Sequence, residues 1–171
     1  LRRDVEQRLG QRHAGCAIQH GMVHLHVEGR LPALQALDDM LRPLGFLVQR
    51  PVFSEAGTPD VENLYARLSG NGPHLMFAGH TDVVPVDGQN WTSDPFKAAV
   101  RGDKLYGRGA CDMKSYLAVV LAMAPRFAAA NLKAPVHFAL SYDEEVGCIG
   151  ARDLLEDLAR NDIRPAGAII G

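Results

Sequence analysis

The sequence predicts a layered α/β fold around a largely parallel, mixed sheet. Helical and strand-like segments alternate from about residue 34 onward, which is typical of helices packed on the faces of a sheet. Residues 136–142 are almost all apolar, as expected for a strand covered on both faces. Hydrophobic residues make up 47% of the 171 residues, so the chain can bury a sizeable core.

The first half of the chain contains a helix followed by several strands. Leucines recur at helical spacing between positions 34 and 44, and Gly45 is a suitable stop signal. Residues 46–53 read as a strand, and residues 54–60 form a turn-rich cluster. Alternation over residues 64–68 predicts a half-buried strand, and residues 74–79 form a short apolar strand.

The second half continues the alternation. A polar loop with Trp91 precedes a small hairpin around residues 101–104. Residues 114–131 predict a helix that Pro125 should kink or divide. We expect a further helix over residues 151–160, with Leu154, Leu155 and Leu158 facing inward, and a buried strand over residues 166–170.

Residues 1–33 fit this pattern less well, and we treat them as an atypical segment before residues 34–171. Val23, Leu25 and Val27 alternate with polar residues, which predicts a strand with one polar face. His24 and His26 are spaced like a metal pair in an amidohydrolase barrel, but that fold needs about 250 residues and further ligands. We therefore favour a solvated strand face over a metal site.

Composition excludes several functional classes. The formal net charge of -2 argues against an electrostatic nucleic-acid binder. No apolar run has the about 20 residues that a membrane span requires. The three cysteines lack C-x-x-C spacing, so they predict neither a disulfide scaffold nor a cysteine zinc site. We interpret each of them as a small buried apolar residue and expect a reducing cytoplasm.

Ionisable residues gather where predicted strands end. His80 and Asp82 follow one apolar strand, Glu144 and Glu145 follow another, and Asp112 follows a glycine-rich turn before a helix. Ligands collect at the carboxyl ends of strands in α/β sheets, so these side chains should meet at one edge. Imidazole and carboxylate donors without thiolate suit Zn²⁺, Co²⁺ or Mn²⁺.

Alternative roles remain open for these residues individually. Asp82 lies two positions after His80 and can accept the proton of the imidazole nitrogen that faces away from a metal. Asp112 reads either as a helix N-cap or as a ligand that bridges two metal ions. Glu144 and Glu145 read either as a solvated turn or as one metal ligand beside one proton-transfer group.

Three segments resemble the zinc-dependent aminoacylase and carboxypeptidase-G type metallohydrolases. They are PHLMFAGHTDVVPVDGQNWTSDPF, LYGRGACDMK and LSYDEEVGCIGARDLL, within a similar stretch from about residue 63 to residue 171. The resemblance implies a zinc-peptidase-like fold and a cis peptide bond after Asp112. It also implies a centre of two Zn²⁺ ions, or Co²⁺ in their place. The implied roles are metal ligand for His80, Asp112 and Glu145, partner of His80 for Asp82, and general base for Glu144.

Within that family the segments are most similar to the acetylornithine deacetylases of arginine biosynthesis. The resemblance implies hydrolysis of N2-acetyl-L-ornithine to ornithine and acetate, with succinyl-diaminopimelate desuccinylase, a general aminoacylase or an inactive truncated remnant as alternatives. Its partner would be a small N-acyl amino acid, without nucleic acid or membrane, and a homodimer of the full-length enzyme is compatible with it.

Two features depart from the family pattern. The first 30 or so residues lack the family's opening helix, and Ser115 stands where the family usually has glycine. The resemblance also places a further acidic ligand, a lid domain and a late histidine ligand beyond Gly171. We therefore expect only the N-terminal part of a catalytic domain here, and no turnover from these 171 residues alone.

Overall fold

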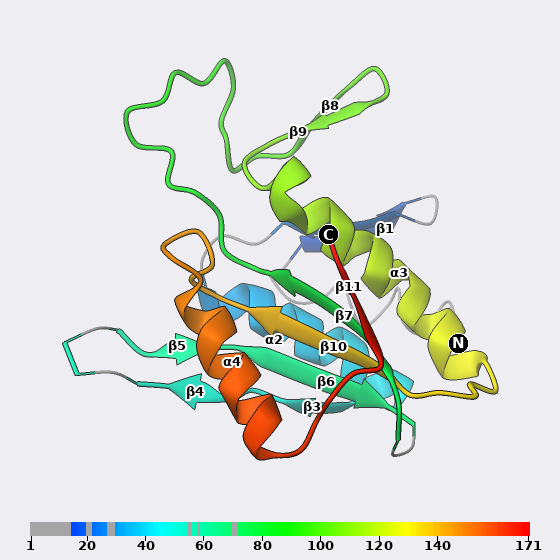
Figure 1. Cartoon of the computed structure of the whole chain (residues 1–171). Helices are drawn as coiled ribbons and strands as arrows, with labels where there is room; N and C mark the ends of the chain where they lie inside the picture. Colours follow the sequence, from blue (N-terminus) through cyan, green and yellow to red (C-terminus); the bar gives the residue numbers. More distant parts are fainter. Residues whose placement is uncertain (1–14, 20–21, 27–29, 55, 58, 70–71) are drawn as a thin grey trace.

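The computed structural model describes residues 15–19, 22–26, 30–54, 56–57, 59–69 and 72–171. Its centre is a five-stranded sheet in the order β11-β7-β10-β6-β3 (Figure 1). Strand β7 runs parallel to both β10 and β11, whereas β6 is antiparallel to β10 and β3. The predicted mixed α/β fold is therefore confirmed. The strands are β3 (Leu47–Gln49), β6 (Leu64–Leu68), β7 (Leu75–His80), β10 (Val136–Ser141) and β11 (Gly167–Ile170).

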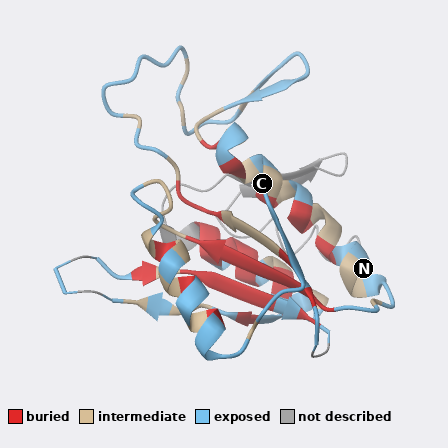
Figure 2. Cartoon of the chain, in the orientation of Figure 1, coloured by how far each residue is buried: buried red, intermediate tan, exposed pale blue. Residues whose placement is uncertain are grey.

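Helices cover the two faces of this sheet. Helices α2 (Arg30–Leu41) and α3 (Ser115–Ala129) lie on one face, and α4 (Ile149–Arg160) lies on the other (Figure 1). The larger core lies under α2 and α3, where Leu34, Leu37 and Leu121 pack on strand residues such as Phe138. A smaller core lies under α4. All six residues of β10 are buried, as its apolar sequence predicts (Figure 2).

Short elements surround this framework. Three two-stranded sheets pair β1 (Gly15–Gln19) with β2 (Met22–His26), β4 (Val52–Phe53) with β5 (Val61–Glu62), and β8 (Ala99–Arg101) with β9 (Lys104–Tyr106). The β8–β9 pair confirms the predicted hairpin. The remaining short elements are the 3₁₀ turn η1 (Arg42–Leu44) and the irregular turn η2 (Ala110–Lys114), in which Asp112 and Met113 have non-helical backbone angles. None of the helices in the described ranges is long and apolar enough to cross a membrane.

The amino-terminal predictions have a mixed outcome. Backbone pairing in β2 confirms the predicted strand up to His26, while Val27 lies outside the described residues. The side chains of His24 and His26 also lie outside them, so the choice between a solvated face and a metal pair stays a prediction. The division between residues 33 and 34 is likewise untested, although α2 begins at Arg30.

Several predicted strands differ in detail. The strand predicted over residues 46–53 is interrupted, because β3 ends at Gln49 and Pro51 has no N–H group to donate to a partner. Strand β6 is almost fully buried instead of half-buried, because Tyr65 packs in the α4 core and only Arg67 faces solvent. Strand β11 is an exposed edge instead of a buried strand, with Ile170 73% exposed.

The helices show two further differences. Pro125 does not divide α3, which continues to Ala129. A proline removes only its own N–H group from the helical hydrogen bonds, so the rest of the helix can continue. On α4, Leu154 and Leu158 face the core as predicted, but Leu155 is 64% exposed. Consecutive helix residues are about 100° apart, so Leu155 is turned away from the face that its neighbour buries.

Candidate metal centre

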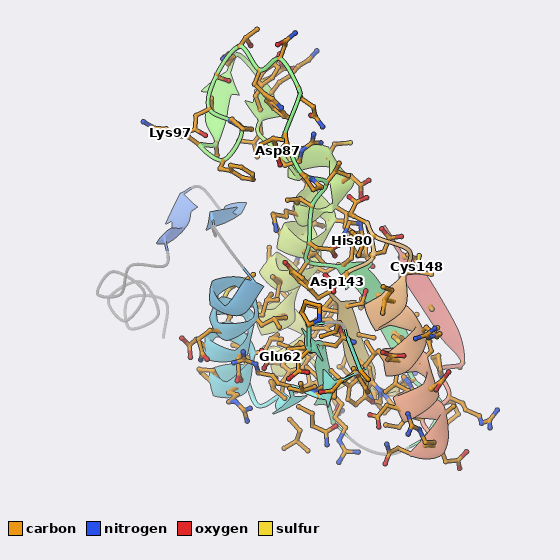
Figure 3. All side chains as sticks on the ribbon, turned by 90° about the vertical axis from the view of Figure 1, so that its left-hand side faces the viewer. Glu62, His80, Asp87, Lys97, Asp143 and Cys148 are labelled. Carbon is orange, nitrogen blue, oxygen red and sulfur yellow. The ribbon has the colours of Figure 1, made fainter. Side chains whose placement is uncertain are left out.

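Two parallel strands bring the predicted site residues to one edge of the sheet. In the pairing of β7 with β10, His80, the last residue of β7, lies beside Ser141, the last residue of β10. The N–H of Thr81 donates to the carbonyl of Ser141 at 2.9 Å and keeps the emerging chains together. Residues 142–148 therefore pass His80 directly after β10 ends. Figure 3 labels His80 and Cys148 at this end, from which the loop with Asp87 and Lys97 extends.

The His80 ring is held on one side and faces acidic groups on the other. It is only 6% exposed, and its Nδ1 atom is 3.2 Å from the main-chain oxygen of Asp82, a hydrogen-bond distance. The Asp82 carboxylate oxygen Oδ1 is farther from Nδ1, at 3.5 Å. Atom Nε2 is 3.0 Å from Oδ1 of Asp112 and 3.8 Å from Oε2 of Glu144. The backbone of Asp82 thus orients the ring, and Nε2 is the atom directed at potential ligands.

Asp82 connects His80 to the acidic loop. The residue is 8% exposed, and its Oδ2 atom accepts the N–H of Glu145 at 3.0 Å. Its Oδ1 atom is buried and has no hydrogen-bond partner among the described residues. A buried carboxylate oxygen without a donor is costly unless a positive charge lies nearby. The sequence predicted that the Asp82 side chain would accept the imidazole proton, whereas the hydrogen-bonded acceptor here is its main-chain carbonyl.

Three side chains can share one ion. Ligand atoms of His80, Glu144 and Glu145 all lie within 4.8 Å of one another. One nitrogen and two carboxylate donors match the preference of Zn²⁺, and the negative charge of Asp82 behind His80 adds to the attraction for a cation. The residues present therefore fit a divalent metal ion.

Asp112 reaches the same place from a different part of the chain. It follows the β8–β9 hairpin, and the peptide bond from Asp112 to Met113 is cis, as the resemblance implied. The Met113 side chain packs over Gly79, and its sulfur accepts the N–H of His80 at 3.1 Å. Helix α3 begins only at Ser115 and has no side-chain N-cap hydrogen bond, so the N-cap interpretation of Asp112 is wrong.

Two neighbours of the site were not singled out from the sequence. Lys114 donates from Nζ to the carbonyl of Thr81 at 2.7 Å, and its burial lowers the pKa of the ammonium group while Asp82 opposes this shift. The thiol of Cys148 donates to Oε1 of Glu144 at 3.3 Å, and this hydrogen bond raises the thiol pKa. Cys111 and Cys148 are both exposed, so the prediction of buried cysteines is wrong for these two.

Several known proteins are similar to this chain. The model of Peptidase family M20/M25/M40 matches residues 76–171, more than half of the chain. Human carnosine dipeptidase 1 has 26% identity and a TM-score of 0.71, covering 81% of this chain and 32% of that one. The M20 family metallo-carboxypeptidase Sso-CP2 from Sulfolobus solfataricus has 27% identity and a TM-score of 0.67. The match covers 84% of this chain and 32% of that one.

A more distant structure shares the fold alone. The glutaminyl cyclase of Fimbriiglobus ruber has 21% identity and a TM-score of 0.64, and the match covers 85% of this chain and 54% of that one. Of the carnosine dipeptidase and the metallo-carboxypeptidase described above, this chain spans only about a third of the length.

Proposed function

Because this chain belongs to Peptidase family M20/M25/M40, we propose that it carries the metal-binding part of a hydrolase that cleaves amide bonds. In this proposal His80, Asp112 and Glu145 bind one or two Zn²⁺ ions, and Co²⁺ can replace them. The observation that carries the proposal is the convergence of His80 and Glu145 with Glu144 beside them, since one potential donor atom of each lies within 4.8 Å of the others. Asp112 adds a further carboxylate, because its Oδ1 atom lies 3.0 Å from Nε2 of His80, the ring nitrogen that Glu144 also approaches.

The metal and the side chains have separate roles in this chemistry. A divalent ion, when bound, supplies a Lewis acid for the scissile carbonyl and for the attacking water. Glu144 is the proton carrier: its carboxylate is 36% exposed, so substrate and water can reach it, and it lies beside the His80 ring. It takes a proton from the attacking water and delivers it to the leaving amine. Asp82 orients His80 and holds the backbone of Glu145.

For the substrate we propose a small N-acyl amino acid, with N2-acetyl-L-ornithine as the leading candidate. The support is the similarity of three motifs, above all DEEVGCIG at residues 143–150, to the acetylornithine deacetylases. Desuccinylation of succinyl-diaminopimelate and general aminoacylase activity use the same chemistry on other acyl groups. We place the reaction in the cytoplasm, in agreement with the absence of cysteine pairing motifs.

A second candidate is hydrolysis of short peptides. It is supported by two similar solved structures with 26% and 27% identity, a carnosine dipeptidase and a metallo-carboxypeptidase. Both candidate reactions break an amide bond next to an amino acid, so the same side-chain roles serve either one.

A substrate comparison tests the proposal. The protein expressed from its complete reading frame would be reconstituted with Zn²⁺ or Co²⁺. The ratio kcat/KM would then be measured for N2-acetyl-L-ornithine, succinyl-diaminopimelate and a dipeptide. We expect the highest value for acetylornithine. A clear preference for the succinyl substrate or the dipeptide would move the assignment to that reaction. Equal rates with and without metal would contradict a metal-dependent hydrolase.

A further inference from the structure

We propose that Asn63 is a positioning residue for the metal centre, because its side-chain amide holds together both ends of the loop that carries Glu144 and Glu145. This inference rests on the function proposed above. Asn63 lies between β5 and β6 and is fully buried, at 0% exposure. Among the described residues its hydrogen bonds go to Pro51, Tyr142 and Gly150 and to none of the proposed ligands, so it acts through the position of the loop.

The Asn63 amide makes one hydrogen bond to each end of the loop. Its Oδ1 atom accepts the N–H of Tyr142 at 2.8 Å, at the point where β10 ends. Its Nδ2 atom donates to the carbonyl of Gly150 at 2.7 Å, in the first turn of α4. The backbone of Asn63 is fixed as well, because its own N–H donates to the carbonyl of Pro51 at 2.9 Å. One rigidly held side chain therefore joins β10 to α4.

The loop is narrow where Asn63 binds it. A Cβ atom on Gly150 would lie 1.9 Å from the carbonyl oxygen of Tyr142, so the two ends touch and only glycine allows this approach. Within the loop, the N–H of Cys148 donates to the carbonyl of Glu144 at 2.8 Å. Glu144 and Glu145 thus lie on a short loop whose position is set where Tyr142 and Gly150 meet; we call this meeting point the neck of the loop.

A primary amide satisfies both partners at the neck. Tyr142 presents a donor and Gly150 an acceptor, and asparagine offers one acceptor oxygen and one donor nitrogen at the required reach. An ionised aspartate would keep the bond to Tyr142 but set a negative oxygen against the Gly150 carbonyl. Leucine has nearly the same shape but can make neither of these two hydrogen bonds.

A displaced neck would disturb the centre. The N–H of Glu145 binds Asp82, and Asp82 in turn contacts His80 through its main-chain oxygen. A shift of the loop therefore changes the distances among His80, Glu144 and Glu145 together. Partners that orient metal ligands typically change metal affinity by about 10- to 100-fold when they are removed.

The test compares Asn63→Leu and Asn63→Asp with a control of similar instability, Leu37→Ala. Leu37 is buried on α2, on the face of the sheet opposite α4. Zn²⁺ affinity of the full chain would be measured by calorimetry, and hydrogen exchange would be followed over residues 142–150. We expect Asn63→Leu to bind Zn²⁺ about tenfold more weakly or worse, with faster exchange in the loop. Asn63→Asp should weaken Zn²⁺ binding less than Asn63→Leu does. The Zn²⁺ affinity of Leu37→Ala should stay within about twofold of the wild-type value.

The outcomes separate this inference from the proposed function. Wild-type affinity in both Asn63 variants, at a loss of thermal stability equal to that of Leu37→Ala, would overturn the positioning role alone. If Asn63→Leu does not fold, wild-type affinity in Asn63→Asp overturns it in the same way. A wild-type chain that binds no metal would overturn the proposed metal centre, and the positioning role with it.

Discussion

Buried histidines lie near opposite ends of the central strands, and their surroundings differ. His80 ends β7, where Asp82, Asp112 and Glu144 all lie within 4 Å of its ring nitrogens. His137 is near the start of β10, and its Nδ1 atom is 2.6 Å from the hydroxyl of Tyr65. Both histidines are 6% exposed, so burial alone does not distinguish them.

The charged groups around each ring distinguish His80 from His137. His74 stacks on His137 with ring centroids 3.6 Å apart. Burial, then His74 and Arg67, lower the pKa of His137 to about 4, and burial raises the pKa of Tyr65 to about 12. This end of the sheet therefore favours uncharged side chains. Carboxylates at the other end favour a cation, which is why we assign metal binding to His80 and a structural role to His137.

The largest effect is expected on catalysis, at the end that carries His80. Glu144→Gln keeps the shape of the side chain but removes the group that accepts the proton. We expect kcat of the full-length enzyme to fall about 10²- to 10⁴-fold while Zn²⁺ affinity stays within a few-fold. Steady-state kinetics on acetylornithine and calorimetry with Zn²⁺ measure the two quantities. A near-normal kcat would refute the role of Glu144.

The second prediction compares the two histidines directly. His80→Ala removes the only nitrogen of the proposed ligand set, and we expect Zn²⁺ affinity to fall at least about 100-fold. His137→Phe should leave it unchanged. Elemental analysis of dialysed protein measures the bound metal. Full occupancy in His80→Ala, or metal loss in His137→Phe, would contradict the assignment.

The third prediction concerns the support beneath His80. A Cβ atom on Gly79 would lie 2.4 Å from Cε of Met113, whose sulfur accepts the His80 N–H. We expect Gly79→Ala to lower the free energy of unfolding by about 1–3 kcal/mol, because the buried Met113 must move. Gly167→Ala in β11 is the matched control, since its added Cβ approaches Leu75 only to 3.9 Å. Urea denaturation that gives equal losses for both variants would exclude a special packing role for Gly79.

The smallest effect is expected from pH at the other end of the sheet. The folded-state pKa of His137, about 4, lies below the ordinary histidine value of 6.5, so folding favours the neutral ring. The stability that the neutral His137 ring contributes to the folded state is fully present above about pH 6.5 and is lost as the pH falls toward 4. We expect the free energy of unfolding to fall by about 1–2 kcal/mol over this pH interval.

The corresponding control is His137→Phe, which cannot titrate at this position. Its unfolding free energy should depend less on pH between 6.5 and 4 than that of the wild type. Equal pH dependence of the two proteins would show that other groups, and not His137, produce the acid sensitivity.

The sequence predicted the part of the fold that local patterns determine. Apolar runs identified β7 and β10, and polar residues directly after them identified His80, Asp82, Glu144 and Glu145. Placing these residues together needed only the rule that parallel strands end at the same edge. Asp112 was harder, since a glycine-rich turn before a helix resembles an N-cap as much as a ligand.

Long-range packing accounts for what the sequence did not predict. Asn63 is an ordinary polar residue before a strand, and its role arises only when the ends of a distant loop meet on its amide. Leu155 belongs to the helical apolar pattern yet faces solvent, because the sheet covers only part of α4. The burial of Tyr65 likewise depends on α4 packing over β6, which no local pattern in β6 records.

The most direct test follows the histidine rings during metal binding. A long-range ¹H–¹⁵N spectrum resolves ring nitrogens, and variants at positions 74, 80 and 137 would assign the signals. Addition of one equivalent of Zn²⁺ should shift the Nε2 resonance of His80 and leave those of His74 and His137 in place. An unchanged His80 signal, or a shift of His74 and His137 in its stead, would contradict the conclusion that surrounding carboxylates determine which histidine binds metal.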